Sequence, residues 1–281
     1  MIVFFNGQFC PAEQARVSIF DRGFLYGDGL FEAVRVYSGR LFLWEKHLDR
    51  LERGAAELNI RIPFNRKDLT GIAHELLGRN KSVEAIMRLQ LTRGQGKRGY
   101  SPRGAENPTF CVTVHPHVMT DQGKWKLQIS RYSFCSRDKT LQVKTSSKIV
   151  QVLAKGEAEE AGYDEALFLN HENCVAEASG GNIFWLKGKI MYTPKPDVGL
   201  LPGVTRQFVM DLGGELKLKV SEVSAQLETL LKSDGAFLTS TGIEIVPIQE
   251  VEGKKMKESP WVNKLIKAYA DVVGEFRKTG R

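Results

Sequence analysis

Cysteine is scarce in this sequence, and long apolar runs are absent. The chain has four cysteines and no CxxC pair, so neither a disulfide framework nor a zinc site is expected. No apolar run approaches the roughly 20 residues that a membrane-spanning helix requires. The N-terminus also lacks the basic segment and the long apolar core of a signal peptide. We therefore expect a protein of the reducing cytoplasm.

No segment concentrates charge of one sign strongly. The chain has 40 Lys and Arg against 33 Asp and Glu, a formal net charge of +7. Such an excess suits nucleic acid, an acidic membrane or an anionic small molecule. The one basic concentration, from Arg93 to Arg103, lies in a glycine-rich loop without the interleaved aromatic residues of a single-strand binder. We expect an anionic small molecule, and no nucleic acid or membrane partner.

Histidines that could bind a metal are isolated. The pair His115 and His117 resembles a short metal clamp, but no carboxylate or cysteine near it in the sequence completes a ligand set. No metal site is expected.

The 281 residues suffice for two modest domains of α+β class. We expect a small N-terminal domain over residues 1–115, a polar linker over 116–123 and a larger domain over 124–281. Period-two alternation predicts strands at 2–5, 29–37, 41–43, 85–92, 109–115, 125–130, 140–144, 165–169, 182–186, 189–192 and 235–239. Helical spacing predicts helices at 44–58, 67–77 and 149–161, and from about 205 and 261. Residues 21–29 contain too much glycine for a helix and are expected to form a loop.

A lysine, Lys144, ends one of these strand patterns. An amine held at a strand end and partly removed from water is a good nucleophile, because desolvation disfavours its ammonium form. Residues 145–147, Thr-Ser-Ser, are suited to cap the next helix. Lys139, Lys148 and Lys155 are the competing lysines, and a solvated strand-end lysine is the ordinary interpretation of Lys144.

A carboxylate, Glu177, stands between an apolar strand and the small residues 178–181. Small residues let a ligand approach the backbone closely. A carboxylate in this setting suits a cationic pyridine nitrogen, which it keeps protonated. An exposed strand glutamate is the alternative.

Three segments could bind phosphate through helix N-termini, hydroxyls or arginine. They are the turn 203–206, Gly-Val-Thr-Arg; the turn 239–242, Thr-Ser-Thr-Gly; and Arg50. Each is a weak signal alone, and a solvated helix face is the ordinary interpretation of Arg50. With Lys144 and Glu177 they form a set that fits pyridoxal phosphate.

Several motifs occur in the order of one known family over nearly the whole chain. They are Asp21-Arg-Gly, Gly27-Asp-Gly-Leu-Phe-Glu32, His47-Leu-Asp-Arg-Leu51, Glu177 with Asn182-Ile-Phe184, Thr193-Pro194, Gly203-Val-Thr-Arg206 and Glu244-Ile-Val-Pro247. The chain thus resembles the class IV aminotransferases, the fold-type IV pyridoxal-phosphate enzymes. This resemblance implies a two-domain fold like that of D-amino-acid aminotransferase, with an α/β-barrel-like C-terminal domain carrying the cofactor lysine and the cofactor between the domains. It also implies a homodimer whose partner loop borders each site.

The resemblance further implies a role for each candidate residue. Lys144 binds the cofactor covalently and moves the substrate α-proton, and Glu177 faces the ring nitrogen. Leu201 packs on the ring. The implied phosphate ligands are Arg50, Val204, Thr205 and Thr241, with Ser240 in the same turn.

The subfamily marks are mixed. The loop 93–101 and Asn182-Ile-Phe-Trp185 look like aminodeoxychorismate lyases, whereas Ser240 and Ala33 stand where those lyases usually carry asparagine and often threonine. Phe31 replaces the strand tyrosine of D-amino-acid aminotransferases, and Arg103-Gly-Ala105 lacks their histidine.

Arg35 is similar to the strand arginine of branched-chain aminotransferases, and either Arg35 or Arg98 is the expected carboxylate anchor. The expected substrate-binding residues are Phe31, Arg35, Arg98, Thr241 and Gly242. The leading function is amino-group transfer between a branched-chain or D-amino acid and a 2-oxo acid. The alternative is an aminodeoxychorismate lyase that releases pyruvate and 4-aminobenzoate, and a third possibility is a cofactor-binding protein without turnover.

Overall fold

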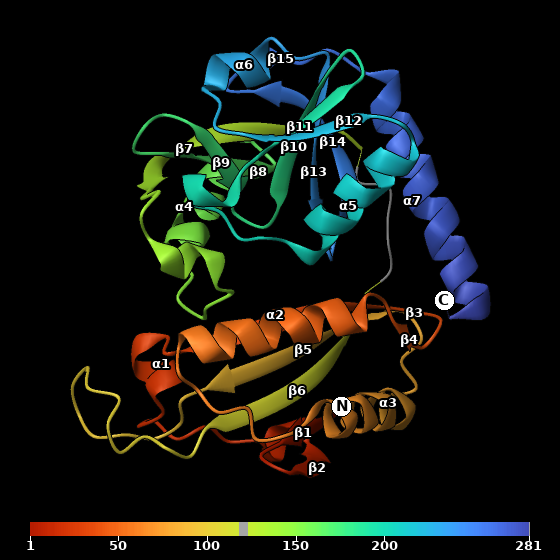
Figure 1. The fold of residues 1–281 in the computed structure, drawn as a ribbon. Coiled ribbons are helices and arrows are strands. Elements are labelled where there is room, and N and C mark those ends of the chain that lie inside the picture. The colour runs from red at the N-terminus through yellow and green to blue at the C-terminus, as the bar shows by residue number, and fades with distance from the viewer. Residues whose placement is uncertain (118–122, 281) are drawn as a thin grey trace. The chain divides into compact units, whose positions relative to one another are not determined.

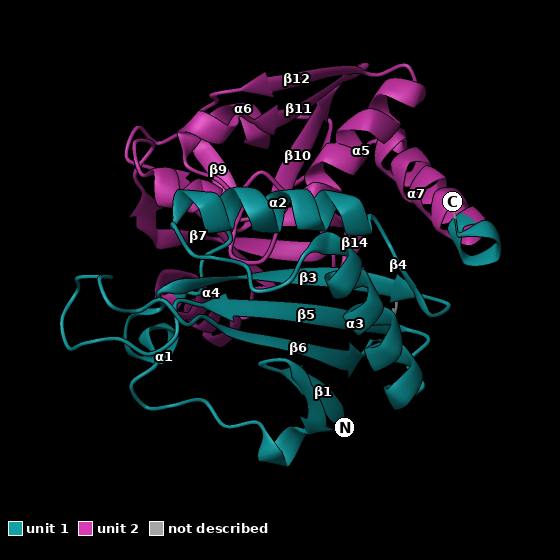
Figure 2. Ribbon diagram, turned by 60° about the horizontal axis from the view of Figure 1, so that its bottom comes forward, with its two compact units in different colours: residues 1–118, 143–148, 276–281 teal, residues 119–142, 149–275 magenta. Residues whose placement is uncertain are grey.

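The computed structural model describes residues 1–117 and 123–280, which fall into two compact units (Figure 2). Unit 1 comprises Met1–Val118, Val143–Lys148 and Phe276–Arg281, and unit 2 comprises Met119–Gln142 and Ile149–Glu275. Most of the expected linker, at 118–122, lies outside the described residues.

Two short segments of the expected second domain, 124–281, belong to unit 1 instead. The lysine-bearing segment 143–148 joins it through backbone hydrogen bonds: Phe31 N donates to Lys144 O at 2.9 Å, and Ser146 N donates to Gly29 O at 2.9 Å. The C-terminal end joins it through Arg277, whose Nη2 lies 3.0 Å from Glu84 Oε2. Lys144 therefore belongs to the N-terminal unit by its contacts, although it follows the linker in sequence.

Unit 1 is built on an antiparallel sheet in the order β2-β1-β6-β5-β3-β4 (Figure 1). Its strands are β1 (Ile2–Phe5), β2 (Gln8–Pro11), β3 (Gly29–Tyr37), β4 (Arg40–Leu41), β5 (Ala85–Thr92) and β6 (Thr109–Pro116). Its helices are η1 (Ala12–Gln14), α1 (Arg22–Tyr26), α2 (Trp44–Glu57) and α3 (Arg66–Asn80).

The alternation of side chains along β3 and β5 decides which face of this sheet is covered. Met87, Leu89 and Leu91 are at most 1% exposed and form one core with the apolar sides of α2 and α3, including Leu48 and Leu51. The intervening residues of β5 are only half-buried. Successive side chains of a strand point to opposite faces, so the second face of the sheet carries the polar residues.

Unit 2 contains a mixed sheet in the order β12-β11-β10-β13-β14-β7-β8-β9, with β15 paired to β14. Its strands are β7 (Trp125–Phe134), β8 (Glu165–Asn170), β9 (Val175–Ala178), β10 (Asn182–Lys187), β11 (Ile190–Pro194), β12 (Lys219–Val223), β13 (Gly235–Ser240), β14 (Glu244–Val251) and β15 (Lys254–Lys255). Its helices are η2 (Lys139–Gln142), α4 (Ile149–Glu160), η3 (Pro196–Val198), α5 (Val204–Glu215), α6 (Leu227–Leu231) and most of α7 (Pro260–Thr279). Because β9 also contacts β10 and β11, the sheet curls toward a barrel.

Two sequence expectations differ from the observed elements for the same physical reason. Residues 139–142 form the 3-10 helix η2 rather than the start of a strand, because Asp138 Oδ1 accepts hydrogen bonds from Thr140 N and Oγ1 at 2.9 and 2.6 Å. Residues 22–26 form helix α1 rather than a loop: Asp21 caps its first turn by accepting from Gly23 N at 2.7 Å. Short side-chain acceptors of this kind override the local propensity.

Helix α4 forms where expected, but it buries only part of the expected apolar stripe. That stripe comprised Ile149, Val152, Leu153, Ala158 and Ala161. Ala158 faces the core together with Ala154, whereas Ile149, Val152 and Leu153 are 66%, 63% and 44% exposed. An apolar surface is therefore left open on this helix.

None of the described helices combines the length and the apolar character needed to cross a membrane.

Candidate active site

Lys144 lies at the edge of β3, where its segment runs antiparallel to the start of the strand. Leu30 and Thr145 form an isolated β-bridge there. The side chain is half-buried, and Nζ lies 4.5 Å from the centroid of the Phe31 ring. Two of the competing lysines lie in other surroundings: Lys139 is exposed, and Lys155 Nζ is paired with Glu159 at 3.1 Å. The amine of Lys144 is thus held against an aromatic ring on unit 1.

Arg50 is buried in an ion pair with Glu32 of β3. Its Nε and Nη2 donate to the two carboxylate oxygens at 2.7 and 2.8 Å, which is the bidentate geometry that fixes a guanidinium most firmly. His47 Nδ1, one turn earlier on α2, lies 2.8 Å from Glu32 Oε2. The solvated helix face that was the alternative for Arg50 is therefore not observed: its side chain is 8% exposed.

The ionisation of this cluster is set by burial and by its neighbouring charges. Burial alone would raise the pKa of Glu32, but the charge and hydrogen bonds of Arg50, with the hydrogen bond from His47, lower that pKa to about 2. The pKa of His47 is lowered mainly by burial, against the pull of Glu32 and with help from the charges of Arg50 and Lys144. Glu32 is therefore an anion and His47 is neutral at neutral pH.

Glu177 of unit 2 lies on β9 and is half-buried. Its Oε2 accepts from Asn182 Nδ2 at 3.2 Å and from Leu201 N at 3.1 Å. Asn182 Nδ2 also donates to Leu201 O at 2.9 Å, so one amide side chain fixes both the carboxylate and the turn after η3. The sequence motif had included Asn182, but its role in orienting Glu177 was not predicted.

The expected phosphate-binding residues of unit 2 converge at the start of helix α5. Gly203 is its N-cap, and no side chain caps the first turn, which begins at Val204. Thr205 Oγ1 lies 3.5 Å from Thr241 Oγ1 in the turn between β13 and β14, which Ser240 and Gly242 flank. Helix N-termini with hydroxyl donors bind phosphate readily.

Arg206, the last residue of that motif, is directed elsewhere. It is 3% exposed and donates to Pro194 O at 2.8 Å and to Glu222 Oε1 at 2.5 Å. Its role in the structure is therefore to join α5 to the strands β11 and β12.

The two expected carboxylate anchors occupy different surroundings. Arg35 is 1% exposed, donates to His117 O at 2.8 Å and lies 3.4 Å from Glu84 Oε2. Arg98 is exposed in the loop between β5 and β6 and makes no hydrogen bond or ion pair with the part of the chain that the structure describes. The structure does not bring these two residues together.

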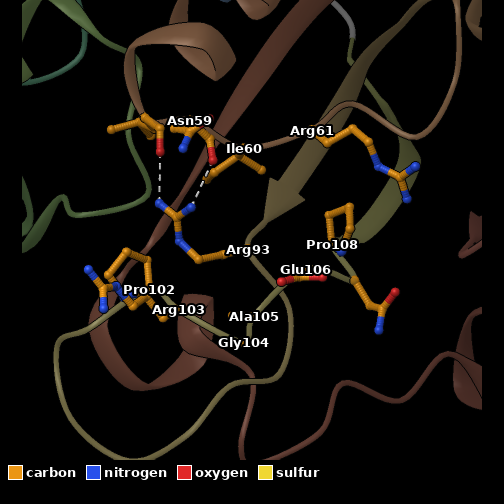
Figure 3. Close-up of a pocket in the computed structure, with 12 residues that line it drawn as sticks. Asn59, Ile60, Arg61, Arg93, Pro102, Arg103, Gly104, Ala105, Glu106 and Pro108 are labelled. Carbon is orange, nitrogen blue, oxygen red and sulfur yellow. Dashed lines mark hydrogen bonds between the residues drawn. The ribbon is translucent and has the colours of Figure 1, made fainter.

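The loop after β5 is held in place by two other arginines. Arg22 Nη1 and Nη2 donate to the carbonyls of Gly99 and Tyr100, and both Arg22 and Arg93 are paired with Asp28 at 2.8 Å. Arg93 donates to the carbonyls of Leu58 and Asn59 at 2.8 and 2.9 Å, and all three residues line a hollow of 660 Å³. Figure 3 shows Arg93 and Asn59 in this lining. No expected site residue lines that hollow, and Arg93 is a structural anchor of the loop.

A further arginine, Arg88, was missed by the sequence analysis. It lies on the open face of β5, and its guanidinium carbon is 3.8 Å from the Phe31 ring centroid. Its Nε and Nη2 donate to Gln90 Oε1 at 3.2 and 2.9 Å. Arg88 and Gln90 alternate with buried leucines, and this alternation was the available signal. The structure places them beside Phe31, and Phe31 beside Lys144.

Comparison with known proteins gives one consistent family. The family model "Amino-transferase class IV" matches residues 29–251. A Methanocaldococcus jannaschii protein assigned as a branched-chain-amino-acid aminotransferase is 36% identical, over 90% of this chain and 89% of its own length. Aminodeoxychorismate lyase of Bacillus subtilis is 31% identical, over 89% and 87% of the two chains. The crystal structure of the Thermoproteus uzoniensis branched-chain aminotransferase with norvaline superposes with a TM-score of 0.92, at 26% identity and covering 97% and 94%.

Enzymes of this kind use pyridoxal phosphate, and another similar branched-chain aminotransferase, 26% identical, was solved with pyridoxamine 5'-phosphate. The donors present here fit that group. Unit 1 offers the amine of Lys144 and the guanidinium of Arg50, and unit 2 offers an oriented carboxylate, an uncapped helix N-terminus and two adjacent hydroxyls.

Proposed function

Because the chain belongs to the class IV aminotransferase family, we propose that it uses pyridoxal phosphate to move an amino group between an amino acid and a 2-oxo acid. The observation that carries the proposal is the half-buried amine of Lys144, fixed by backbone hydrogen bonds to β3 and set against Phe31.

Lys144 supplies the proton transfers of this reaction. Bound pyridoxal phosphate provides an electron sink for the bonds at the substrate α-carbon. Lys144 Nζ would take the proton from the substrate α-carbon as a general base. It would then deliver the proton to the cofactor carbon as a general acid.

The remaining residues hold and tune the cofactor. Glu177, fixed by Asn182 and Leu201 N, supplies the negative charge that favours a protonated ring nitrogen. Leu201 packs on the ring. Arg50, Val204, Thr205, Ser240 and Thr241 bind the phosphate.

A substrate carboxylate binds to Arg88 in this proposal. Arg88 flanks Phe31, whereas the guanidinium of Arg35 is engaged by His117 O and Glu84. The backbone amides of Thr241 and Gly242, in the turn between β13 and β14, donate hydrogen bonds to a second carboxylate of the substrate. Arg98, in the loop of a partner subunit, contributes positive charge to the binding of the substrate carboxylate.

A homodimer is the proposed assembly, and exposed apolar residues support it. Unit 1 exposes such side chains around α1, and unit 2 exposes them on α4; they are Val17, Ile19, Phe20, Phe24, Leu25, Ile149, Val152 and Leu153. Monomeric proteins rarely leave large groups of apolar side chains in contact with water, as each of these two segments does. The four cysteines are free thiols, which suits the proposed cytoplasmic location.

A two-substrate assay tests the proposed reaction. Purified enzyme is incubated with L- or D-amino donors and a 2-oxo acid, and the new amino acid is quantified by chromatography. Formation of product that depends on both substrates is the expected result. Turnover of no donor in either series contradicts the proposal.

The lyase is the second candidate, because aminodeoxychorismate lyase of Bacillus subtilis is 31% identical and the loop 93–101 is basic. Release of pyruvate and 4-aminobenzoate from aminodeoxychorismate, without an acceptor, would select this reaction over transamination.

A further inference from the structure

Gln90 connects Arg88 to the segment that carries Lys144. Its Oε1 accepts two hydrogen bonds from Arg88, at 3.2 and 2.9 Å, and its Nε2 donates to Ser146 Oγ at 2.6 Å. A guanidinium has donors only, so the amide oxygen must face Arg88 and the amide nitrogen must face Ser146. Ser146 N in turn donates to Gly29 O at 2.9 Å. The orientation of Gln90 is thus fixed from both ends.

Four other buried or half-buried arginines of unit 1 bind carboxylates, whereas half-buried Arg40 donates to the carbonyl of Phe276. Arg22 and Arg93 pair with Asp28, Arg35 with Glu84, and Arg50 with Glu32. Each of these guanidinium charges is compensated within the protein.

Arg88 is different, because its hydrogen bonds within the described residues go to a neutral amide. It is half-buried, and burial lowers its pKa from the ordinary value. Lys144 Nζ lies on the same Phe31 ring, at 4.5 Å from its centroid against 3.8 Å for Arg88. Two cationic groups therefore share one ring, and the group that orients Arg88 adds no negative charge.

We propose that Gln90 is a positioning residue that orients the Arg88 guanidinium without neutralising it, so that its full charge is available to a substrate carboxylate. A glutamate at this position could keep both hydrogen bonds to Arg88, but its charge would compete with the substrate. This inference rests on the proposed role of Arg88 as a carboxylate anchor.

Binding of glutarate to the holoenzyme tests the inference, with 4-methylvalerate as a monocarboxylate probe. Affinity is measured by calorimetry and stability by thermal unfolding, for wild type, Gln90→Glu, Gln90→Ala and Arg88→Met. Gln14→Glu is the matched control, because Gln14 is an exposed residue of unit 1. If Arg88→Met loses affinity for glutarate alone, Arg88 binds the side-chain carboxylate of the substrate. If Arg88→Met loses affinity for both probes, Arg88 binds the α-carboxylate.

Gln90→Glu is expected to bind glutarate about 10- to 100-fold more weakly than wild type. The new carboxylate would pair with Arg88, so the probe would lose a charge-assisted hydrogen bond to that guanidinium. It is expected to bind more weakly than Gln90→Ala even though its Tm is at or above that of Gln90→Ala. A purely structural role predicts the opposite order, since alanine removes every hydrogen bond and glutamate keeps those to Arg88. Wild-type affinity in Gln90→Glu, or an affinity in Gln90→Ala as low as in Gln90→Glu, overturns the inference.

Arg88→Met separates this inference from the proposed function. If Arg88→Met binds both probes with unchanged affinity, Arg88 does not bind the substrate carboxylate. The proposed role of Gln90 is then rejected as well. Weak binding by Arg88→Met together with normal binding by Gln90→Glu leaves the anchor standing and rejects the role of Gln90. If Arg88→Met does not fold, Arg88→Lys takes its place, because lysine keeps the charge and loses the planar fork.

Discussion

Glu32 is the residue whose ionisation the fold controls most strongly. Its carboxylate is 1% exposed and is bound by Arg50 on both oxygens and by His47 on one. A buried carboxylate without such partners would be protonated. The ion pair orients Arg50 as well as compensating its charge, so a residue of β3 sets the position of Arg50, the phosphate ligand proposed on α2.

Replacing Glu32 should change how stability depends on pH. Its pKa is lowered from 4.5 to about 2 in the folded state, so its contribution is present above pH 4.5 and is lost as the pH falls toward 2. The full contribution is about 3 kcal/mol in the free energy of unfolding. Glu32→Gln should therefore lose about this much at pH 7 and show a flatter profile between pH 4.5 and 2. Urea unfolding at several pH values measures this, and parallel profiles for the two proteins would refute it.

Lys144→Ala should abolish turnover without unfolding the protein. The segment is held through the backbone of Lys144, Thr145 and Ser146, which alanine retains. Loss of the positioned base alone should cost about 10⁴-fold in kcat. Borohydride reduction of the wild-type holoenzyme followed by peptide mass spectrometry should place the phosphopyridoxyl group on Lys144. Lys139→Ala is the control, with unchanged turnover; a label on Lys139 would show that the assignment is wrong.

At the scale of elements, the start of helix α5 leaves no space for a side chain at Gly203. A Cβ on Gly203 would lie 2.2 Å from Asn182 Oδ1, far inside contact distance. Since Asn182 holds both Glu177 and Leu201, displacing it would disturb two parts of the candidate cofactor site at once.

Gly203→Ala should weaken cofactor binding. The overlap should cost about 1–3 kcal/mol, or about 10- to 100-fold in the dissociation constant of pyridoxal phosphate from the apoenzyme. Gly214→Ala in the same helix is the matched control, because no atom lies within 4 Å of its added Cβ. That control should bind the cofactor normally and be stabilised by about 0.5–1 kcal/mol. Equal affinities in a fluorescence titration of both variants would contradict the account.

The elements that periodicity defines were predicted well. The strand at 85–92 matches β5, and the helix at 44–58 matches α2 to within one residue. Strands β2, β9, β12 and β14 were not predicted. Two further differences, α1 and η2, depend on single acceptor side chains, those of Asp21 and Asp138. These hydrogen bonds leave no periodic signal.

The candidate site was only partly predictable. Lys144, Glu177 and Arg50 carry local signals or family motifs. Arg88 and Gln90 become visible only through strand pairing, because Gln90 lies opposite Phe31 in the register of β3 and β5. Which face of that sheet the helices cover is a tertiary property that the alternation alone does not assign.

At the scale of the whole molecule, the exposed apolar residues around α1 should mediate assembly. Phe24 is 72% exposed in a segment that also exposes Ile19 and Phe20. Phe24→Glu should weaken association of the proposed dimer about a hundredfold. Val83→Glu is the control, because Val83 is 62% exposed and lies outside that segment. Sedimentation equilibrium measures both variants, and a Phe24→Glu protein that associates like Val83→Glu would rule out this interface.

The central claim is that the chain accepts an amino group from a substrate on its own cofactor. The most direct measurement is the absorption spectrum of the holoenzyme during titration with L- and D-amino acids, without any 2-oxo acid. We expect stoichiometric loss of the band of the lysine-bound cofactor and appearance of pyridoxamine phosphate, with one donor series preferred. A band that persists across the whole panel would contradict the claim.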